Sequence, residues 1–497
     1  MVWSGFALLL TLSAVPVFST VLPPLLDYPN HLARMHLLAE GGDAFYSVQW
    51  AVLPNLAEDL LVPPLARVIP LDVAAKLFLV TIFALMAGGV IWLNRIATGG
   101  WRLWPLFGFF FLYNRILFWG FLNYLFGIGV ALCGIALWLT LESRRWWLRV
   151  LLSSLVALAC FFSHIAAFGF YALAIIGVEF LPAVVELRGR QWQPFGRRIT
   201  LGIPQFIAPV GLWLGLQHDV PAGTVSFAAI WRKADLLFSV FDNYNRAFDV
   251  FCFALFLALI GWLVWTRRLG LAPRLAAAAG LVFAAYLVLP SQIHGGSGAD
   301  HRLPTAFFLL LVAASSPNFP NPRFAKAVGV IATLVLVVRL GMIERVWRDA
   351  DRVYLADLAA IDALPQGSKI AIAHPADLFH VVPIPEVHLA LLAIPRRAAF
   401  VPTLFAIAGQ QPVALKPAFA ALAGAAPPQP LWAILTAARS ADRALLPAVL
   451  EQFDFVAIVD KRPVHLPPHR CLAPVSVQPT FQIYAVSHNL DCVGPDD

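Results

Sequence analysis

Apolar runs long enough to cross a lipid bilayer recur between residues 2 and 343, and no other feature limits the possible folds of this chain as strongly. A hydrocarbon core about 30 Å thick needs roughly 20 apolar residues for each helical crossing. The 497 residues are 60% hydrophobic and only 13% charged, and a water-soluble protein has no place for so much apolar surface. The sequence therefore predicts a polytopic α-helical membrane protein.

We predict about eleven transmembrane helices, followed by a water-soluble domain. The predicted spans are residues 2–22, 73–93, 103–117, 121–141, 147–163, 165–181, 199–217, 249–266, 275–290, 303–316 and 327–343. No basic segment precedes the first span and no small-residue cleavage site follows it, so we interpret it as a retained helix. Residues 1–343 then form a transmembrane domain and residues 344–497 a small α/β domain.

Basic residues collect in alternate connectors between these spans. The connectors rich in Arg and Lys hold Arg95, Arg102, Arg144, Arg145, Arg149, Arg188, Arg190, Arg197, Arg198, Arg267, Arg268, Arg274, Arg323 and Lys326. The other short connectors hold only Arg115 and Arg302. Cytoplasmic connectors carry the positive excess, so we predict a bacterial inner-membrane protein with a cytoplasmic N-terminus and a periplasmic C-terminal domain. The net charge of +7 reflects this placement, and we predict no binding of nucleic acid.

Most of the chain outside the membrane is predicted on the periplasmic side. The first outer loop, residues 23–72, contains two amphipathic stretches that suit helices along the membrane surface. In the C-terminal domain, helical patterns alternate with strand-like runs, which favours an α/β layer. These runs are residues 369–373, 453–460 and 481–486. Cys471 and Cys492 either form a disulfide there, if the compartment is oxidising, or remain two thiols.

The sharpest cluster of polar residues follows the first span and contains Asp27, Asn30, His31 and Arg34. Asp27 lies where one carboxylate can meet both a lipid headgroup and a soluble acceptor. Alternatively, Asp27 or Asn30 only caps the helix that follows. His31 and Arg34 lie three residues apart on one helical face, where they orient Asp27, contact a phosphate, or are simply solvated.

Four more residues near the predicted outer ends are candidates for substrate or phosphate binding, namely Arg302, Asp300, His164 and Arg115. Arg302 can pair with a phosphate in bidentate geometry, or it reaches the membrane interface or pairs with Asp300. His164 lies in a tight outer hairpin and either faces the same cavity or is a buried structural histidine. Arg115 lies at another outer turn. The spacing of His and Asp residues around Arg302 matches no metal-ligand signature, so we predict no metal and no other cofactor.

This layout resembles the C-type glycosyltransferase superfamily (GT-C), which includes protein mannosyltransferases and aminoarabinose transferases. The likeness rests on the retained first helix, the long outer loop that opens with Asp27, the many spans and the outer C-terminal domain. It implies a GT-C-like fold and a sugar donor linked to polyprenyl phosphate. It also implies that Asp27 is the catalytic base and that Arg302 binds the lipid phosphate. Relatives often carry a second acidic residue in the region of Arg115, and its absence here puts metal-dependent variants of the mechanism in doubt.

The chemistry needs only one carboxylate, because a polyprenyl phosphate is already a good leaving group, unlike the leaving group in glycoside hydrolysis. We therefore predict an inverting hexosyl- or pentosyltransferase that moves a sugar to a lipid, glycan or protein acceptor, with Asp27 as base and Arg302 stabilising the phosphate. Two other classes stay open. A transporter or flippase of a lipid-linked glycan is disfavoured because we find little midplane charge and no internal repeat, and a catalytically silent envelope scaffold remains possible because the second acid is missing.

Overall fold

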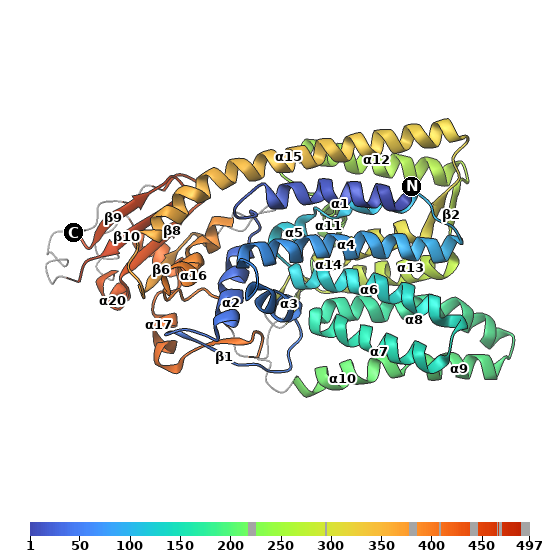
Figure 1. The fold of residues 1–497 in the computed structure, drawn as a ribbon, viewed down its shortest axis with the longest axis horizontal. Helices are drawn as coiled ribbons and strands as arrows, with labels where there is room; N and C mark the ends of the chain where they lie inside the picture. The colour runs from blue at the N-terminus through green and yellow to red at the C-terminus, as the bar shows by residue number, and fades with distance from the viewer. Residues whose placement is uncertain are drawn as a thin grey trace.

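The computed structural model of the chain describes residues 1–216, 225–293, 296–376, 385–406, 409–437, 446–464, 466 and 470–488. Long helices lie side by side in a bundle, and a smaller region of short helices and strands covers one end of it (Figure 1). The N-terminus lies at the opposite end of the bundle. We call the smaller region, from residue 370 onward, the C-terminal region.

Within the described residues, six helices are long and apolar enough to cross a membrane, or up to eight if each of two bent helix pairs is one span. The predicted number of eleven spans is therefore not confirmed. The bundle helices are α1 (Val2–Phe18), α4 (Leu71–Thr98), α6 (Leu122–Thr140), α7 (Trp146–Ser163), α8 (Ile165–Arg188), α9 (Trp192–Gly202), α10 (Pro204–Leu216), α12 (Arg246–Trp265), α13 (Pro273–Val288), α14 (Ala299–Ala314) and α15 (Pro322–Asp362). Helices α1, α13 and α14 have 17, 16 and 16 residues, fewer than the roughly 20 that a full crossing needs.

The predicted span at residues 103–117 is wrong as a single helix. The chain forms a 3-10 helix, η1 (Trp104–Phe111), and then a separate short helix, α5 (Arg115–Trp119). Asn114 separates them, because its side chain accepts a hydrogen bond from the backbone N–H of Leu117 and so caps the start of α5. A polar cap after a run of apolar residues was the sequence signal for this break.

This broken segment nevertheless runs the length of the bundle. At one end, Trp101 packs edge to face on Trp3, with ring centroids 5.4 Å apart. At the other end, the backbone oxygen of Trp119 accepts a hydrogen bond from the N–H of Asp27. A 3-10 helix rises about 2.0 Å per residue against 1.5 Å for an α-helix, so fewer residues cover the distance. The segment thus returns the chain to the end at which the first loop begins.

The C-terminal region contains a four-stranded sheet in the order β6-β8-β10-β9, with β6 and β8 parallel and the other pairs antiparallel. The strands are β6 (Ile370–Ala373), β8 (Phe455–Val459), β10 (Phe481–Val486) and β9 (Leu472–Val477). The three predicted strands are confirmed, and β9 was missed because it is a mostly exposed edge strand that contains proline. The other elements are η5 (Pro385–Leu392), α16 (Ala393–Arg397), β7 (Val413–Leu415), η6 (Pro417–Phe419), α17 (Ala420–Ala425), α18 (Pro428–Leu435) and α20 (Leu446–Leu450).

Two structures connect the bundle to the C-terminal region. Helix α15 runs without a break through residue 343, the predicted boundary between the two domains. In the first loop, β1 (Tyr46–Val48) pairs antiparallel with β7. The same loop forms α2 (Tyr28–Glu40) and α3 (Ala57–Ala66), which confirms both predicted amphipathic helices. The remaining elements are η2 (Leu141–Ser143), α11 (Ile230–Phe238), β2 (Leu269–Leu271), β3 (Gln292–Ile293), β4 (Gly296–Ser297) and β5 (Ser315–Pro317).

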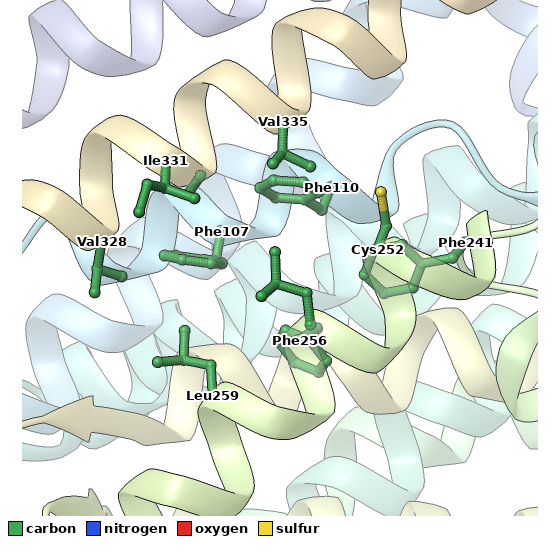
Figure 2. Close-up of a pocket in the computed structure, with 11 residues that line it drawn as sticks. Phe107, Phe110, Phe241, Cys252, Phe256, Leu259, Val328, Ile331 and Val335 are labelled. Carbon is green, nitrogen blue, oxygen red and sulfur yellow. The ribbon is translucent and has the colours of Figure 1, made fainter. Parts of the chain in front are cut away.

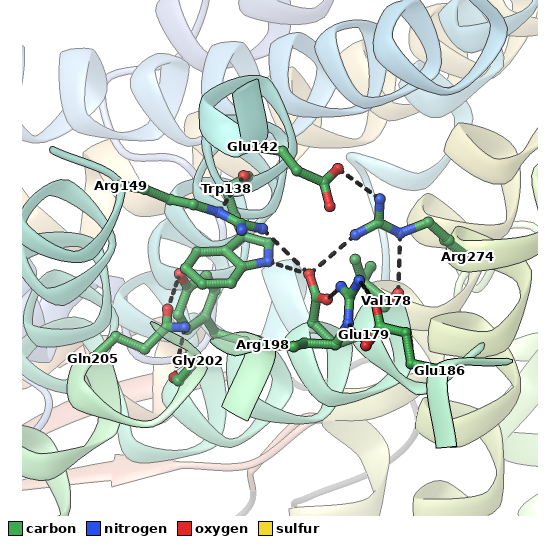
Figure 3. A network of polar contacts seen from close by, with 11 residues as sticks. Trp138, Glu142, Arg149, Val178, Glu179, Glu186, Arg198, Gly202, Gln205 and Arg274 are labelled. Carbon is green, nitrogen blue, oxygen red and sulfur yellow. Dashed lines mark hydrogen bonds and ion pairs between the residues drawn. The ribbon is translucent and has the colours of Figure 1, made fainter. Parts of the chain in front are cut away.

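A polar network connects five helices (Figure 3). It includes α9, which lies toward the end of the bundle that carries the N-terminus (Figure 1). At the centre of the network is Glu179 of α8, whose Oε1 accepts hydrogen bonds from Nε1 of Trp138 at 2.6 Å, from Arg149 at 3.3 Å and from Arg274 at 3.0 Å. Its Oε2 pairs with Arg198. The partners belong to α6, α7, α13 and α9, so one carboxylate contacts arginines from three neighbouring helices, and Glu186 and Glu142 add further negative charge beside Arg198 and Arg274.

Replacing Glu179 with glutamine should lower the free energy of unfolding by about 2 kcal/mol, because hydrogen bonds to a charged group contribute about 1.5–3 kcal/mol each. Thermal unfolding in detergent measures this loss. The matched control is Arg352→Gln, which removes an exposed ion pair with Asp349 and should cost about 1 kcal/mol or less. Equal melting temperatures for the two variants would show that the network contributes little to stability.

Candidate active site

Asp27 lies at the start of α2, but its carboxylate does not cap that helix. In the described part of the chain the side chain makes no capping hydrogen bond. The backbone is fixed instead, since the N–H of Asp27 donates to the oxygen of Trp119 at 3.3 Å and its carbonyl accepts from the N–H of His31 at 2.9 Å. The side chain is 13% exposed. The backbone is thus held firmly while the carboxylate remains available for another role.

Gly120 makes this close approach possible. A Cβ atom at this position would lie 2.8 Å from Cβ of Asp27, closer than such atoms come in proteins. Its φ of +87° is also in the left-handed region that favours glycine. Gly120 ends α5, so the turn after this short helix is built to pack against Asp27.

A histidine from the C-terminal region approaches the Asp27 carboxylate. Nε2 of His388, in η5, lies 3.5 Å from Oδ1 of Asp27. The His388 ring packs edge-on against Phe405, with centroids 5.5 Å apart. Asn30 connects α2 to the same loop, because it donates to the oxygen of Thr403 at 3.2 Å and accepts from the N–H of Phe405 at 3.0 Å. Sequence reasoning missed His388, whose one signal was a histidine within an apolar stretch.

His31 and Arg34 are buried in a cluster of charges between α2 and α3. Nδ1 of His31 lies 2.6 Å from Glu58, and Nε of Arg34 donates to Asp59 at 2.7 Å. The exposed fractions are 7% for His31, 1% for Arg34 and Asp59, and 0% for Glu58. Burial alone would lower the pKa of His31, but the Glu58 carboxylate outweighs this effect and raises it.

These contacts bear on the three interpretations of His31 and Arg34. Neither residue is solvated, and both charges already face carboxylates, so their position does not favour contact with a lipid phosphate. The geometry favours the orienting role, because Nε2 of His31 lies 3.0 Å from the carbonyl of Gly120 and so helps fix the turn that packs on Asp27. The acidic partners at the start of α3 were not singled out from the sequence.

Arg302 lies in the first turn of α14 and contacts Phe121, which follows Gly120 in the turn that packs against Asp27. Its guanidinium lies over the ring of Phe121 at 4.7 Å and donates to the carbonyl of Gly298 at 3.0 Å. The ring of His301, the preceding residue, lies 5.0 Å from that of Trp119. Trp119 and Gly120 therefore contact Asp27 and Phe121 contacts Arg302, so the structure brings the two predicted residues to one short turn.

Asp300 is fully buried, so its carboxylate is not accessible to a substrate. Its Oδ2 accepts from the hydroxyl of Ser291 at 2.7 Å and lies 3.5 Å from Nζ of Lys233 in α11. Lys233 also donates to the backbone oxygens of Tyr286 and Leu289. The position of Asp300 favours a structural role, in which it connects α14 to the loop before it and to α11.

Arg115 and His164 also have partners within the protein. Nη2 of Arg115 lies 2.6 Å from Asp242, so an acidic residue far away in sequence pairs with Arg115. His164 accepts a hydrogen bond from the N–H of Ala166 and so caps α8. Burial lowers the pKa of His164 to about 3, which keeps the ring neutral and favours the structural interpretation.

An apolar groove of about 140 Å³ lies between η1, α12 and α15 and is partly open to the outside (Figure 2). It is lined by Phe107, Phe110, Phe241, Cys252, Leu255, Phe256, Leu259, Val328, Ile331, Ala332 and Val335. Arg339 of α15 lies next to the Phe241 end, pairs with Asp249 of α12 at 2.8 Å and donates to the oxygen of Tyr113 at 2.9 Å. Both charges are buried. Arg339 lies near one end of the predicted span 327–343 and Asp249 begins the predicted span 249–266, so the prediction of little midplane charge is not tested by this pair.

The structure contains no group of three or more His, Cys, Asp or Glu residues that could hold a metal, as far as its described residues extend. His294, one of the histidines near Arg302 in sequence, falls outside those residues. Cys492 does too, so the disulfide between Cys471 and Cys492 stays a prediction.

No family model matches the sequence, and no curated protein matches it. Two solved structures do match, both of ArnT from Cupriavidus metallidurans. The one bound to undecaprenyl phosphate has a TM-score of 0.54 and 13% sequence identity over 100% of this chain and 99% of that chain. The apo structure has a TM-score of 0.51 and 12% identity over 99% of each chain. This chain has the ArnT fold.

The ArnT fold agrees with the GT-C resemblance seen in the sequence. The match spans the whole chain, so it includes the C-terminal region that contributes His388 as well as the helical bundle. At 13% identity the likeness establishes the ArnT fold alone, and the function must be argued from the residues of this chain.

Proposed function

We propose that this protein is an inverting glycosyltransferase that moves a sugar from a polyprenyl-phosphate donor to an acceptor at the bundle end that carries the C-terminal region. The observation that carries the proposal is the Asp27 carboxylate, which makes no capping bond in the described structure and lies beside a turn that also contacts Arg302. The ArnT fold supports it, since one ArnT crystal structure contains undecaprenyl phosphate. Release of polyprenyl phosphate from a sugar-loaded donor, followed by mass spectrometry, tests it.

The reaction needs one base and one cation. Asp27 takes the proton of the acceptor hydroxyl as the acceptor oxygen bonds to the anomeric carbon of the sugar. The bond between that carbon and the phosphate oxygen breaks, and its electron pair leaves with the polyprenyl phosphate. The guanidinium of Arg302, which contacts Phe121 in the turn beside Asp27, stabilises the charge of the departing phosphate. A single displacement of this kind inverts the anomeric configuration.

The apolar groove is suited to the polyprenyl chain of the donor. Its lining is almost entirely aromatic and aliphatic, and it lies between helices with exposed apolar faces, where a lipid chain can enter from the bilayer. The Phe241 end of the groove adjoins the buried Arg339–Asp249 pair, which marks the transition from apolar to polar surroundings. A polyprenyl phosphate changes in the same way, from an apolar chain to a charged phosphate headgroup at one end.

Replacing Ala332 with tryptophan should block the groove and weaken binding of undecaprenyl phosphate by about tenfold or more. Each buried CH₂ contributes about 0.8 kcal/mol, and exclusion of two of them already costs about one factor of ten in affinity. Thermal stabilisation of the purified protein by added undecaprenyl phosphate measures the change. The control is Leu334→Trp on the same helix, at a residue that is 60% exposed and outside the groove. Equal binding by both variants would place the lipid chain elsewhere.

We also propose the orientation in the membrane. Several of the basic residues that predict the cytoplasmic side, Arg149, Arg198 and Arg274, gather in the network at the N-terminal end of the bundle (Figure 3). The N-terminus then faces the cytoplasm, and Asp27, Arg302 and the C-terminal region face the periplasm. Cysteine labelling from outside intact cells should modify a cysteine placed at exposed Arg352 and not one placed at exposed Trp192.

A further inference from the structure

We propose that His388, from the C-terminal region, is a positioning residue that orients the Asp27 carboxylate for proton transfer. The inference rests on the proposed function and goes beyond it, because it makes the C-terminal region part of the active site. The observation behind it is the 3.5 Å approach of His388 Nε2 to Oδ1 of Asp27. The two side chains are 12% and 13% exposed, so both are largely shielded from bulk water.

The surroundings of His388 indicate which ring nitrogen carries the proton. Nδ1 is buried and has no hydrogen-bond partner within the described part of the structure, whereas Nε2 faces a carboxylate oxygen. A neutral imidazole has one N–H donor and one acceptor nitrogen, and the arrangement is satisfied best when the proton is on Nε2. Nε2–H then faces Oδ1 of Asp27 across 3.5 Å, a charge–dipole contact that favours one orientation of the carboxylate. This leaves Oδ2 to accept the proton of the substrate hydroxyl.

The framework around the pair keeps it in place. Asn30, three residues after Asp27, makes two hydrogen bonds to the backbone of Thr403 and Phe405. Phe405 packs edge-on against the His388 ring. The backbone of Asp27 is fixed from the other side by Trp119 and the turn at Gly120. The only remaining freedom of the carboxylate is rotation about its side-chain bonds, and the contact with His388 restricts that rotation.

Orientation of the Asp27 carboxylate by His388 affects the rate of transfer and not the binding of the donor. A base must point at the hydroxyl whose proton it takes, and a misplacement of about 1 Å can lower a rate by about a hundredfold. His388 touches neither the leaving phosphate nor the transferred atoms in this proposal. Its loss should therefore reduce kcat while the KM for the donor stays the same.

Three variants of His388 test the role. His388→Ala should lower kcat by about 10- to 100-fold and leave the KM for the donor and the stabilisation by undecaprenyl phosphate unchanged. His388→Gln should recover most of the rate, because its amide nitrogen can reach the position of Nε2, whereas the shorter side chain of His388→Asn cannot. Arg396→Gln, which removes an exposed ion pair with Asp362 in the same region, should behave as wild type.

A double mutant shows whether His388 acts through Asp27. If it does, His388→Ala should have no further effect on the residual rate of Asp27→Asn, since the group it orients is gone. Wild-type kcat in His388→Ala, together with an inactive Asp27→Asn, would overturn this inference and leave the proposed function intact. Full activity of Asp27→Asn would instead remove the proposed function. If His388→Ala does not fold, equal rates for His388→Gln and His388→Asn would overturn the inference.

Discussion

Replacing Asp27 with asparagine should lower the rate of sugar transfer by about two to four orders of magnitude, which is the usual contribution of a general base. Asparagine keeps the shape of the side chain but cannot accept the proton of the acceptor hydroxyl. Because the carboxylate makes no capping hydrogen bond in the described structure, the variant should fold and melt like the wild type. Single-turnover transfer from a polyprenyl-phosphate sugar, measured on protein in nanodiscs, gives the rate.

Two controls make this result specific. Asp72→Asn changes an exposed carboxylate in the first turn of α4 and should keep wild-type activity. Binding of undecaprenyl phosphate should be the same in Asp27→Asn and in wild type, since the lipid chain and phosphate are bound by other residues. A normal rate in Asp27→Asn contradicts the role of base, and a loss of lipid binding would instead indicate a defect in the site as a whole.

Replacing Arg34 with methionine should lower the free energy of unfolding by about 3–5 kcal/mol, because removing one partner of a buried ion pair leaves the other charge uncompensated. Arg34 is 1% exposed, and Asp59 and Glu58 beside it are 1% and 0% exposed. The connection between α2 and α3 would then open, and the first loop would lose its packing. Thermal unfolding in detergent and proteolysis of residues 41–56 both report this change.

The outcome also decides between the two interpretations of Arg34. As a control, Arg352→Gln removes a pair that is 77% and 56% exposed, and such surface pairs contribute about 1 kcal/mol or less. A structural role predicts a large fall in melting temperature for Arg34→Met alone. If Arg34→Met melted like the wild type and only lost affinity for undecaprenyl phosphate, Arg34 would be a phosphate ligand and the structural account of the cluster would be wrong.

The sequence predicted the parts of this fold that depend on local pattern. Long apolar runs marked α4, α6, α7, α8 and α12, and the strands β6, β8 and β10 followed from short runs of β-branched and aromatic residues. The prediction of one helix at residues 103–117 was wrong because apolarity alone does not distinguish an α-helix from a 3-10 helix. The cap at Asn114 overrode the apolar pattern there.

The site was predicted in part, and the missing residues share one cause. Asp27 and Arg302 were found because each lies next to a predicted span, and the structure brings both to residues 119–121. His388, Glu58 and Asp242 act on residues far away in sequence, and a single chain read by local pattern contains no information on such pairing. His31 and Arg34 were recognised as a pair, but the buried carboxylates of Glu58 and Asp59 that pair with them were not.

One measurement tests the central claim most directly. The purified protein in sealed vesicles is incubated with a membrane extract and with isotope-labelled polyprenyl-phosphate sugars, one carrying a hexose and one a pentose. NMR and mass spectrometry then follow the labelled anomeric carbon. We predict that free polyprenyl phosphate appears and that the label is found on an acceptor with inverted anomeric configuration. Recovery of an intact donor, whether it stays in place or crosses the bilayer, would contradict the account.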